Sequence, residues 1–261
     1  MEFFSTSANI ATHIEDSGKG EKVILLLHGY LETMYIWDDL YNDLSGDYRV
    51  IRIDLPGHGL SCTAPVNTME LMATVAKGVL DICKVAKATV IGHSMGGFVA
   101  QHCCRLFPDR FEKMVLLNSY PYPETDDSRE IRAREQGVIN SEHLMTLAEL
   151  SIPKMFHPDN LRRLDEKIRE TVGLCETHDP AGIVACIKGL LQREDTSPWL
   201  ASTKMPVLAI CGDSDTLVTA EIRDHMAVDC PNMRMEVLKD CGHNSFLEYP
   251  ERTLELIREF V

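Results

Sequence analysis

Short apolar runs rich in β-branched residues alternate with longer segments of helical period along most of this 261-residue chain. Six runs are strand candidates, at residues 23–27, 49–54, 88–92, 114–117, 206–211 and 235–238. Most are near-continuous Val, Ile and Leu, which is typical of parallel strands covered on both faces. Helical segments are expected at about 35–45, 68–86, 95–107 and 219–228, and after Pro250. This alternation predicts an α/β fold with a mostly parallel, doubly wound sheet.

The interval 120–201 breaks the alternation. It offers no good strand and consists of polar, helix-forming sequence such as "DNLRRLDEKIRETVGL". Roughly 80 residues is too long for a crossover loop in a compact domain. We therefore expect a core formed by residues 1–119 and 202–261, with 120–201 inserted as a helical lid over the carboxyl ends of the strands. Residues 1–16 are expected to add an antiparallel edge pair.

The composition narrows the classes of partner. With 44% hydrophobic and 25% charged residues, the chain lies in the globular range. A net charge of −14 disfavours nucleic acid, whose phosphates such a surface would repel. The longest apolar runs are too short to span a bilayer, and the N-terminus lacks the pattern of a signal peptide. We expect a small-molecule substrate and no nucleic-acid or membrane partner, while the oligomeric state stays open.

Nine cysteines at irregular spacing contain no C-x-x-C pair. This pattern disfavours a disulfide framework or a zinc site and predicts reduced, mostly buried thiols. A cytoplasmic location is the expectation. No carboxylate–histidine cluster has metal-ligand spacing and no glycine-rich phosphate loop is present, so the sequence predicts a reaction without a cofactor.

The segment "GHSMGG" at 92–97 lies between a strand candidate and an apolar-periodic helix. A strand–G-x-S-x-G–helix context is typical of a nucleophile elbow. The serine, Ser94, would stand on a strained turn with its hydroxyl clear of the sheet, and Gly92 and Gly96 would prevent collisions with neighbouring chains. The ordinary alternative is a capping serine on a tight turn.

A serine hydroxyl needs a base, and the base needs an orienting acid. His243, in "LKDCGHNSFLEYP", follows the final strand candidate and is expected at the same sheet edge as Ser94. His93, beside the nucleophile, is expected to point away from it. Five other histidines are expected on the surface or in the lid: His13, His143, His157, His178 and His225.

The acid is expected between the serine and the histidine in the chain. "PVLAICGDSDTLV" offers Asp213 and Asp215. Asp215 lies farther into the loop and can reach across toward His243, whereas Asp213 is suited to capping the turn. On these grounds Asp215 is preferred and Asp213 remains open.

Negative charge on a tetrahedral intermediate requires fixed N–H donors. The residue after the nucleophile, Met95, supplies one backbone amide. The turn at His28-Gly29, after the first central strand candidate, allows the amide of Tyr30 to point inward as the second. An ordinary strand-ending turn is the alternative for this His-Gly pair.

Five motifs together resemble the α/β-hydrolase superfamily: "LLLHGYLET", "RIDLPGHGLS", "VIGHSMGGFVA", "PVLAICGDSDTLV" and "CGHNSFLEYPE". They occur in the order and spacing of that family, from about Val23 to the C-terminus. The resemblance implies the α/β-hydrolase fold with the acid at Asp215 and the base at His243, and a structural role for His58 in the turn at 54–59. The lid sequence resembles that of small carboxylesterases and enol-lactonases.

The resemblance implies a serine hydrolase that cleaves a small carboxylic ester, lactone or thioester through an acyl-enzyme on Ser94. A carbon–carbon bond hydrolase or lyase on the same scaffold is the runner-up, similar to the menaquinone-pathway synthase or to the meta-cleavage hydrolases. A ligand-binding relative without activity is a third possibility. The synthase family carries an arginine directly after its S-x-G-G turn, where this chain has Phe98, which favours largely uncharged substrates.

Apolar residues near these motifs are candidates for the substrate pocket, although each could equally be core or lid packing. They are Trp37, Phe98, Met145, Met155 and Phe156. Arginines of the lid could still neutralise an anionic substrate. Because acids surround them in sequence, we expect most of the following to be solvated or paired on the lid surface: Arg132, Arg134, Arg162, Arg163 and Arg193.

Overall fold

An eight-stranded sheet forms the centre of the protein, whose computed structural model describes residues 1–140 and 142–261. In chain order the strands are β1 (Glu2–Ser7), β2 (Ile10–Asp16), β3 (Val23–Leu27), β4 (Arg49–Ile53), β5 (Ala88–His93), β6 (Phe111–Leu117), β7 (Val207–Gly212) and β8 (Arg234–Leu238). They lie side by side in the order β1-β2-β4-β3-β5-β6-β7-β8. The predicted α/β sheet is confirmed, and each of the six strand candidates corresponds to a strand.

Strands β3 to β8 pair in parallel, whereas β2 pairs antiparallel with both β1 and β4. The expected N-terminal edge pair is therefore present, and β2 also joins it to the main sheet. All residues of β3, β5 and β7 are buried, as expected for strands with helices on both faces. In register, Leu27 at the end of β3 lies opposite Gly92 of β5, so the loops after these two strands leave the sheet together.

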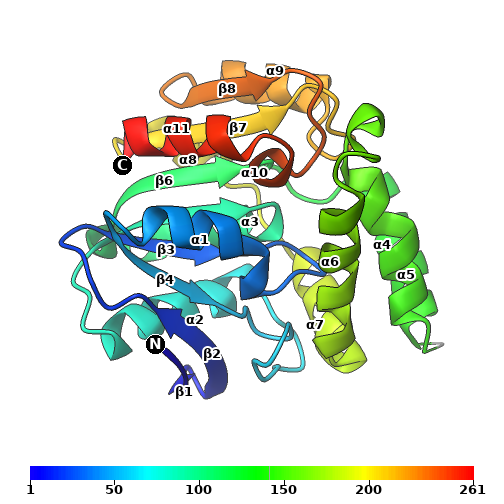
Figure 1. Ribbon diagram of the computed structural model, residues 1–261, viewed down its shortest axis with the longest axis horizontal. Coiled ribbons are helices and arrows are strands. Elements are labelled where there is room, and N and C mark those ends of the chain that lie inside the picture. Colours follow the sequence, from blue (N-terminus) through cyan, green and yellow to red (C-terminus); the bar gives the residue numbers. More distant parts are fainter. Residues whose placement is uncertain (141) are drawn as a thin grey trace.

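Helices cover both faces of the sheet. The helices between the core strands and at the C-terminus are α1 (Asp38–Leu44), α2 (Met69–Ile82), α3 (Met95–Leu106), α9 (Ala220–Asp229), α10 (Ser245–Glu248) and α11 (Pro250–Phe260). Helices α1 and α11 cross in front of the sheet in Figure 1, and α2 and α3 pack against each other behind it. The expected helical segments all contain helix, and the predicted segment at 35–45 splits into a 3₁₀ turn (Met34–Trp37) followed by α1.

The long interval between β6 and β7 contains only helices and loops among its described residues. Its helices are α4 (Asp126–Asn140), α5 (Leu144–Ser151), α6 (Asp165–Leu174), α7 (Pro180–Leu190) and α8 (Ser197–Ser202). Figure 1 shows α4 to α7 stacked beyond the arrowheads of the strands, at their carboxyl ends. Helix α8 crosses the boundary expected at 201/202. It begins at Ser197, after the N-cap residue Thr196 and with Pro198 in its first turn, and it runs to Ser202. The interval 120–201 is called the lid segment below.

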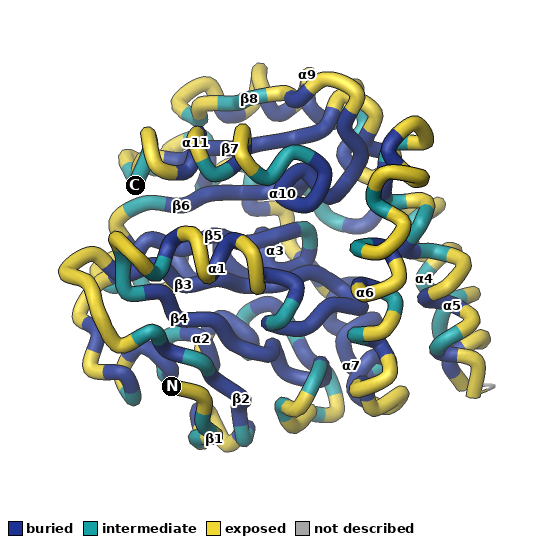
Figure 2. Tube along the Cα trace, in the orientation of Figure 1, coloured by how far each residue is buried: buried dark blue, intermediate teal, exposed yellow. Residues whose placement is uncertain are grey.

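The buried residues follow the sheet and the inner faces of its helices, whereas the outer faces are exposed (Figure 2). All nine cysteines are unpaired, and only Cys62 is exposed, which agrees with the expectation of mostly buried thiols. None of the described helices combines the length and apolar character needed to cross a membrane.

One surface expectation for a histidine is wrong. His13 is fully buried, with Nδ1 2.8 Å from Asp54 Oδ2 and Nε2 2.6 Å from Glu2 Oε1. The side chain lies on β2, which the sequence treated as a plain edge strand. Because β2 is covered by the turn that starts at Asp54, its inward-facing histidine enters the core with two carboxylate partners.

Candidate active site

Ser94 occupies a strained turn between β5 and α3. Its φ of 49° and ψ of −114° lie outside the regions that non-glycine residues favour. A Cβ on Gly92 would lie 2.2 Å from the carbonyl oxygen of Gly96, and a Cβ on Gly96 would lie 2.1 Å from that of Leu27. Glycine at both positions lets strand, turn and helix pack closely enough to hold this conformation.

Asp215 and His243 meet at the same edge of the sheet. His243 Nδ1 lies 2.8 Å from Asp215 Oδ2, and both side chains are buried. The other carboxylate oxygen accepts hydrogen bonds from the amides of Leu217 and Val218, and Asn118 donates to Oδ2. Burial alone would raise the pKa of Asp215, but the neighbouring His243 and these hydrogen bonds lower it to about 2. The carboxylate is thus ionised and oriented toward the imidazole.

The competing acid, Asp213, points elsewhere. It is exposed and accepts hydrogen bonds from the Ser214 hydroxyl and the Cys241 amide. These contacts fit the turn-capping role that the sequence allowed for it.

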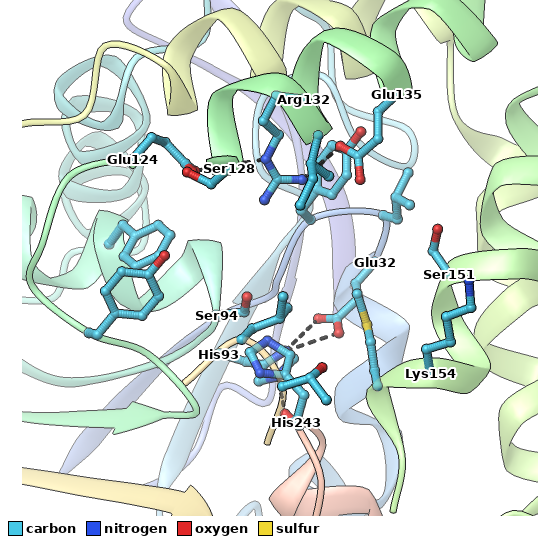
Figure 3. A pocket seen from close by; sticks show the side chains of 18 residues that line it. Glu32, His93, Ser94, Glu124, Ser128, Arg132, Glu135, Ser151, Lys154 and His243 are labelled. Atoms are coloured by element: carbon cyan, nitrogen blue, oxygen red, sulfur yellow. Dashed lines mark hydrogen bonds and ion pairs between the residues drawn. The ribbon is translucent and has the colours of Figure 1, made fainter. Parts of the chain in front are cut away.

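The second imidazole nitrogen of His243 is available. Nε2 is buried and has no hydrogen-bond partner among the described residues. It opens on the cavity that Ser94 also lines, as Figure 3 shows. Catalytic hydrogen bonds are commonly long in unliganded enzymes and tighten with substrate.

Two backbone amides near Ser94 are also available. Neither Tyr30 nor Met95 donates a backbone N–H hydrogen bond within the described part of the chain. Met95 is the first residue of α3, so its amide lies at the positive end of that helix. Amides of this kind can bind a developing oxyanion.

A cavity of about 380 Å³ lies above Ser94, between the sheet edge and the lid segment. Its floor includes Ser94, His93 and His243, and its roof carries Glu124, Arg132 and Glu135 (Figure 3). Its other lining residues are Tyr30, Leu31, Glu32, Phe98, Tyr120, Ser128, Ile131, Ser151, Lys154, Met155, Thr216 and Leu217. The size and the mixed lining suit a small organic substrate.

Only two of the five predicted pocket residues line this cavity, namely Phe98 and Met155. Trp37 is fully buried and packs on Phe246, with ring centroids 4.5 Å apart. Phe156 is part of the hydrophobic core, and Met145 packs against that core from α5. Apolar character in sequence cannot separate a cavity wall from a packed interior, because both require the same side chains.

Two of the five lid arginines are exceptions to the expectation that most of them lie on the lid surface. Arg132 lines the cavity, donates to Glu135 at 2.8 Å and lies 3.8 Å from Glu124. Arg193 is buried, 3.2 Å from Glu124, with its guanidinium 3.7 Å from the centre of the Phe98 ring. Both guanidinium groups are paired with carboxylates, so this part of the wall carries balanced charge.

His93 has a place at the site that the sequence did not indicate. It lines the cavity and forms a buried pair with Glu32, and its Nε2 lies 2.9 Å from the carbonyl oxygen of His243. No sequence signal identified Glu32, because its partner is 61 residues away in the chain. Only the pairing of β3 with β5 brings the two loops together.

Among the described residues, one group of possible metal ligands lies outside the cavity. Possible ligand atoms of Glu70, His102 and Glu194 come within 4.8 Å of one another, a cluster that sequence spacing did not reveal because three distant segments form it. Arg105 lies 2.9 Å from Glu194 and 3.8 Å from Glu70. Arg105 and His102 thus join the two carboxylates in an ion-pair network between α2, α3 and the loop after α7.

Comparison with known proteins identifies the class. The model of a family described as the alpha/beta hydrolase fold matches residues 22–250. The chain belongs to this family and is an α/β-hydrolase enzyme, as its sequence motifs implied.

The chain is similar to named members over nearly its whole length. It is 28% identical to a pimeloyl-[acyl-carrier protein] methyl ester esterase of Nitrosomonas europaea, covering 92% of this chain and 95% of the relative. It is 26% identical to a 2-hydroxy-6-oxononadienedioate/2-hydroxy-6-oxononatrienedioate hydrolase of Paraburkholderia phymatum, covering 97% and 91%. The solved structure of a thermophilic esterase from Thermogutta terrifontis, with malate bound, superposes with a TM-score of 0.91 at 29% identity, covering 99% and 97%.

Proposed function

We propose that this protein is a serine hydrolase that cleaves a small carboxylic ester, lactone or thioester through an acyl-enzyme on Ser94. The observation that carries the proposal is the strained turn of Ser94, beside an imidazole whose other nitrogen is held by a buried carboxylate. Similarity to proteins named as esterases supports ester hydrolysis.

The roles follow from the geometry. His243 Nε2 accepts the proton of the Ser94 hydroxyl as that oxygen attacks the carbonyl carbon, and it then donates the proton to the leaving group. Asp215 holds the imidazole with Nδ1 protonated and stabilises its positive charge. The amides of Tyr30 and Met95 bind the oxyanion. Water activated by His243 then releases the acid and regenerates Ser94.

Labelling with a p-nitrophenyl alkylphosphonate tests this proposal. We expect one phosphonyl group per chain, on Ser94, with stoichiometric release of p-nitrophenol. Ser94→Ala should abolish both labelling and ester turnover, and peptide mass analysis would locate the group. A label on a different serine, or turnover that survives Ser94→Ala, would contradict the assignment.

A carbon–carbon bond hydrolase is the second candidate. The similarity to a hydrolase of 2-hydroxy-6-oxononadienedioate favours it, because that named substrate is a dianion and not a simple ester. The ratio of kcat/KM for p-nitrophenyl acetate to that for the dienedioate separates the two functions. A catalytically inactive ligand-binding protein, the third possibility, would show no acyl transfer to Ser94 with either compound.

We further propose that residues 1–119 and 202–261 form the catalytic core and that 120–201 act as a lid. The four residues of α4 that line the cavity support this division (Figure 3). A cytoplasmic location is also a proposal, supported by nine unpaired cysteines.

A further inference from the structure

A buried pair of ionisable side chains lies beside Ser94. Glu32 belongs to the loop after β3, and His93 is the last residue of β5. Their side chains are 4% and 1% exposed, and His93 Nδ1 lies 3.0 Å from Glu32 Oε1 and 3.1 Å from Oε2. Neither side chain is the nucleophile, the base or the acid of the proposed reaction.

The hydrogen bonds of His93 determine its protonation. Its Nε2 lies 2.9 Å from the carbonyl oxygen of His243, and a carbonyl can only accept, so Nε2 carries a hydrogen. The Glu32 carboxylate at Nδ1 then requires a second proton between the two groups. Burial opposes both charges, yet the mutual attraction outweighs it, so the pKa of Glu32 is lowered and that of His93 is raised. The pair is an imidazolium and a carboxylate.

This pair connects three loops. Glu32 Oε2 accepts a hydrogen bond of 2.6 Å from the amide of Gly29, next to Tyr30. His93 directly precedes Ser94 and donates to the backbone of His243. A Cβ on Gly29 would lie 2.9 Å from both Glu32 Oε2 and His93 Nδ1, so the turn has no space to shift toward the pair.

We propose that Glu32 and His93 form a charged pair that positions the Gly29-Tyr30 turn and the backbone of His243 around Ser94. Its effect on catalysis rests on the proposed function, in which Ser94 and His243 are nucleophile and base. Both are positioning residues, because they act through the Tyr30 amide and the His243 backbone.

Replacement of Glu32 tests the positioning in turnover. In Glu32→Gln, the amide oxygen can accept from Gly29 and the amide N–H can donate to a neutral His93, so both hydrogen bonds survive without charge. Glu32→Ala removes both. We expect Glu32→Ala to lower kcat for p-nitrophenyl acetate about 100-fold with little change in KM, and Glu32→Gln to recover most of this loss, because small displacements of reacting groups cost about this much.

A matched pair outside the cavity provides the control. Glu70 Oε1 lies 3.1 Å from the buried His102 Nε2, between α2 and α3. Glu70→Ala should leave kcat within about twofold of the parent, as is usual for substitutions away from a site. A loss in Glu32→Ala no larger than in Glu70→Ala, or a loss confined to KM, would overturn the positioning role.

Nitrogen-15 NMR of the histidine rings at about pH 7.5 tests the pair without turnover. We expect His93, assigned from the signals lost in His93→Asn, to have both ring nitrogens protonated in the parent and one in Glu32→Gln. The amide resonance of His243 should move in Glu32→Ala and stay in place in Glu70→Ala. A neutral His93 in the parent overturns the proposal, even if Glu32→Ala does not fold. Phosphonate labelling of Ser94 decides the proposed function separately.

Discussion

At the residue scale, hydrogen-bond partners distinguish the two aspartates that the sequence left open. Asp215 is buried and its oxygens face His243, Asn118 and two backbone amides. Asp213 is exposed and closes a turn. The two residues are only two positions apart, yet Asp213 contacts the amide of Cys241 and Asp215 contacts the imidazole of His243.

This difference predicts unequal effects of neutralising the two aspartates. Asp215→Asn should lower kcat on the order of 10⁴-fold, because a neutral amide at this position favours the wrong imidazole tautomer. Asp213→Asn, the matched control, should stay within about tenfold, because its turn contacts lie away from the imidazole. Steady-state kinetics on one p-nitrophenyl ester checks both. Equal losses of kcat in the two variants would contradict the assignment of the orienting role to Asp215.

At the element scale, α4 forms the roof of the cavity with one face. Ser128, Ile131, Arg132 and Glu135 follow the i, i+3, i+4, i+7 spacing of a single helix face, and all line the cavity. Arg132 is the cation on this face, and burial would lower its pKa, but Glu135 and Glu124 raise it. The guanidinium therefore stays charged and paired with Glu135 and Glu124.

A roof whose cation is already paired with carboxylates predicts a preference for uncharged acyl groups. An ester with a carboxylate at the end of its acyl chain would meet Glu124 and Glu135 together with Arg132 and lose its hydration. Its kcat/KM should be at least about tenfold below that of the neutral ester of equal length, a difference of about 1.4 kcal/mol.

Neutralising one roof carboxylate should reduce this preference. Glu135→Gln removes one of the negative charges beside Arg132. It should therefore reduce the difference in kcat/KM between the neutral and the anionic ester. Glu130→Gln on the same helix, where Glu130 pairs with the exposed Arg134, is the control and should leave the gap unchanged. A faster reaction with the anionic ester in the parent protein would refute the preference.

At the scale of the whole molecule, three histidines in edge-to-face contact join the core to the lid segment. His58 lies between His28 and His178, with ring centroids 5.1 Å and 5.2 Å apart. His178 Nδ1 accepts the amide hydrogen of Gly59, and His58 Nε2 accepts that of Leu31. Burial lowers the pKa of His58 well below its ordinary value and that of His178 to about 4. These rings are neutral in the folded protein.

Neutral buried histidines predict a loss of stability in acid. Between pH 6.5 and about 4, His178 is protonated in the unfolded chain but neutral in the folded protein. The free energy of unfolding therefore falls as the pH falls through this range. The slope is at most about 1.4 kcal/mol per pH unit for each such group. The pKa values of His13 and His93 are raised in the folded protein. Their contribution to the free energy of unfolding is therefore complete below pH 6.5 and is lost as the pH rises above it.

Urea unfolding at a series of pH values checks this slope. In His178→Asn the side-chain oxygen can still accept from Gly59, but the titrating group is gone, so the acid slope should be shallower than in the parent. His143→Asn, at an exposed position, should retain the parent slope. The same slope in both variants would exclude His178 as the source of the acid loss.

The sequence by itself determined the parallel sheet, its strands and the turn at Ser94. These depend on local patterns: continuous Val, Ile and Leu runs that must be buried on both faces, and glycines at 92 and 96 that a close backbone crossing requires. The order of motifs also led to Asp215 and His243, whose side chains lie 2.8 Å apart in the structure. Such features are encoded within a few neighbouring residues, so they can be read without the fold.

Only the tertiary structure decided the composition of the cavity wall and the partners of its charges. Glu32 meets His93, and Arg193 meets Glu124, across 61 and 69 residues of chain. Trp37 and Phe98 look alike in sequence, yet one is fully buried in the core and the other lines the cavity. A buried charge is tolerated only where an opposite charge or a hydrogen bond reaches it. Which residues come within that reach depends on how β3, β5 and the lid segment assemble, and no local pattern records this.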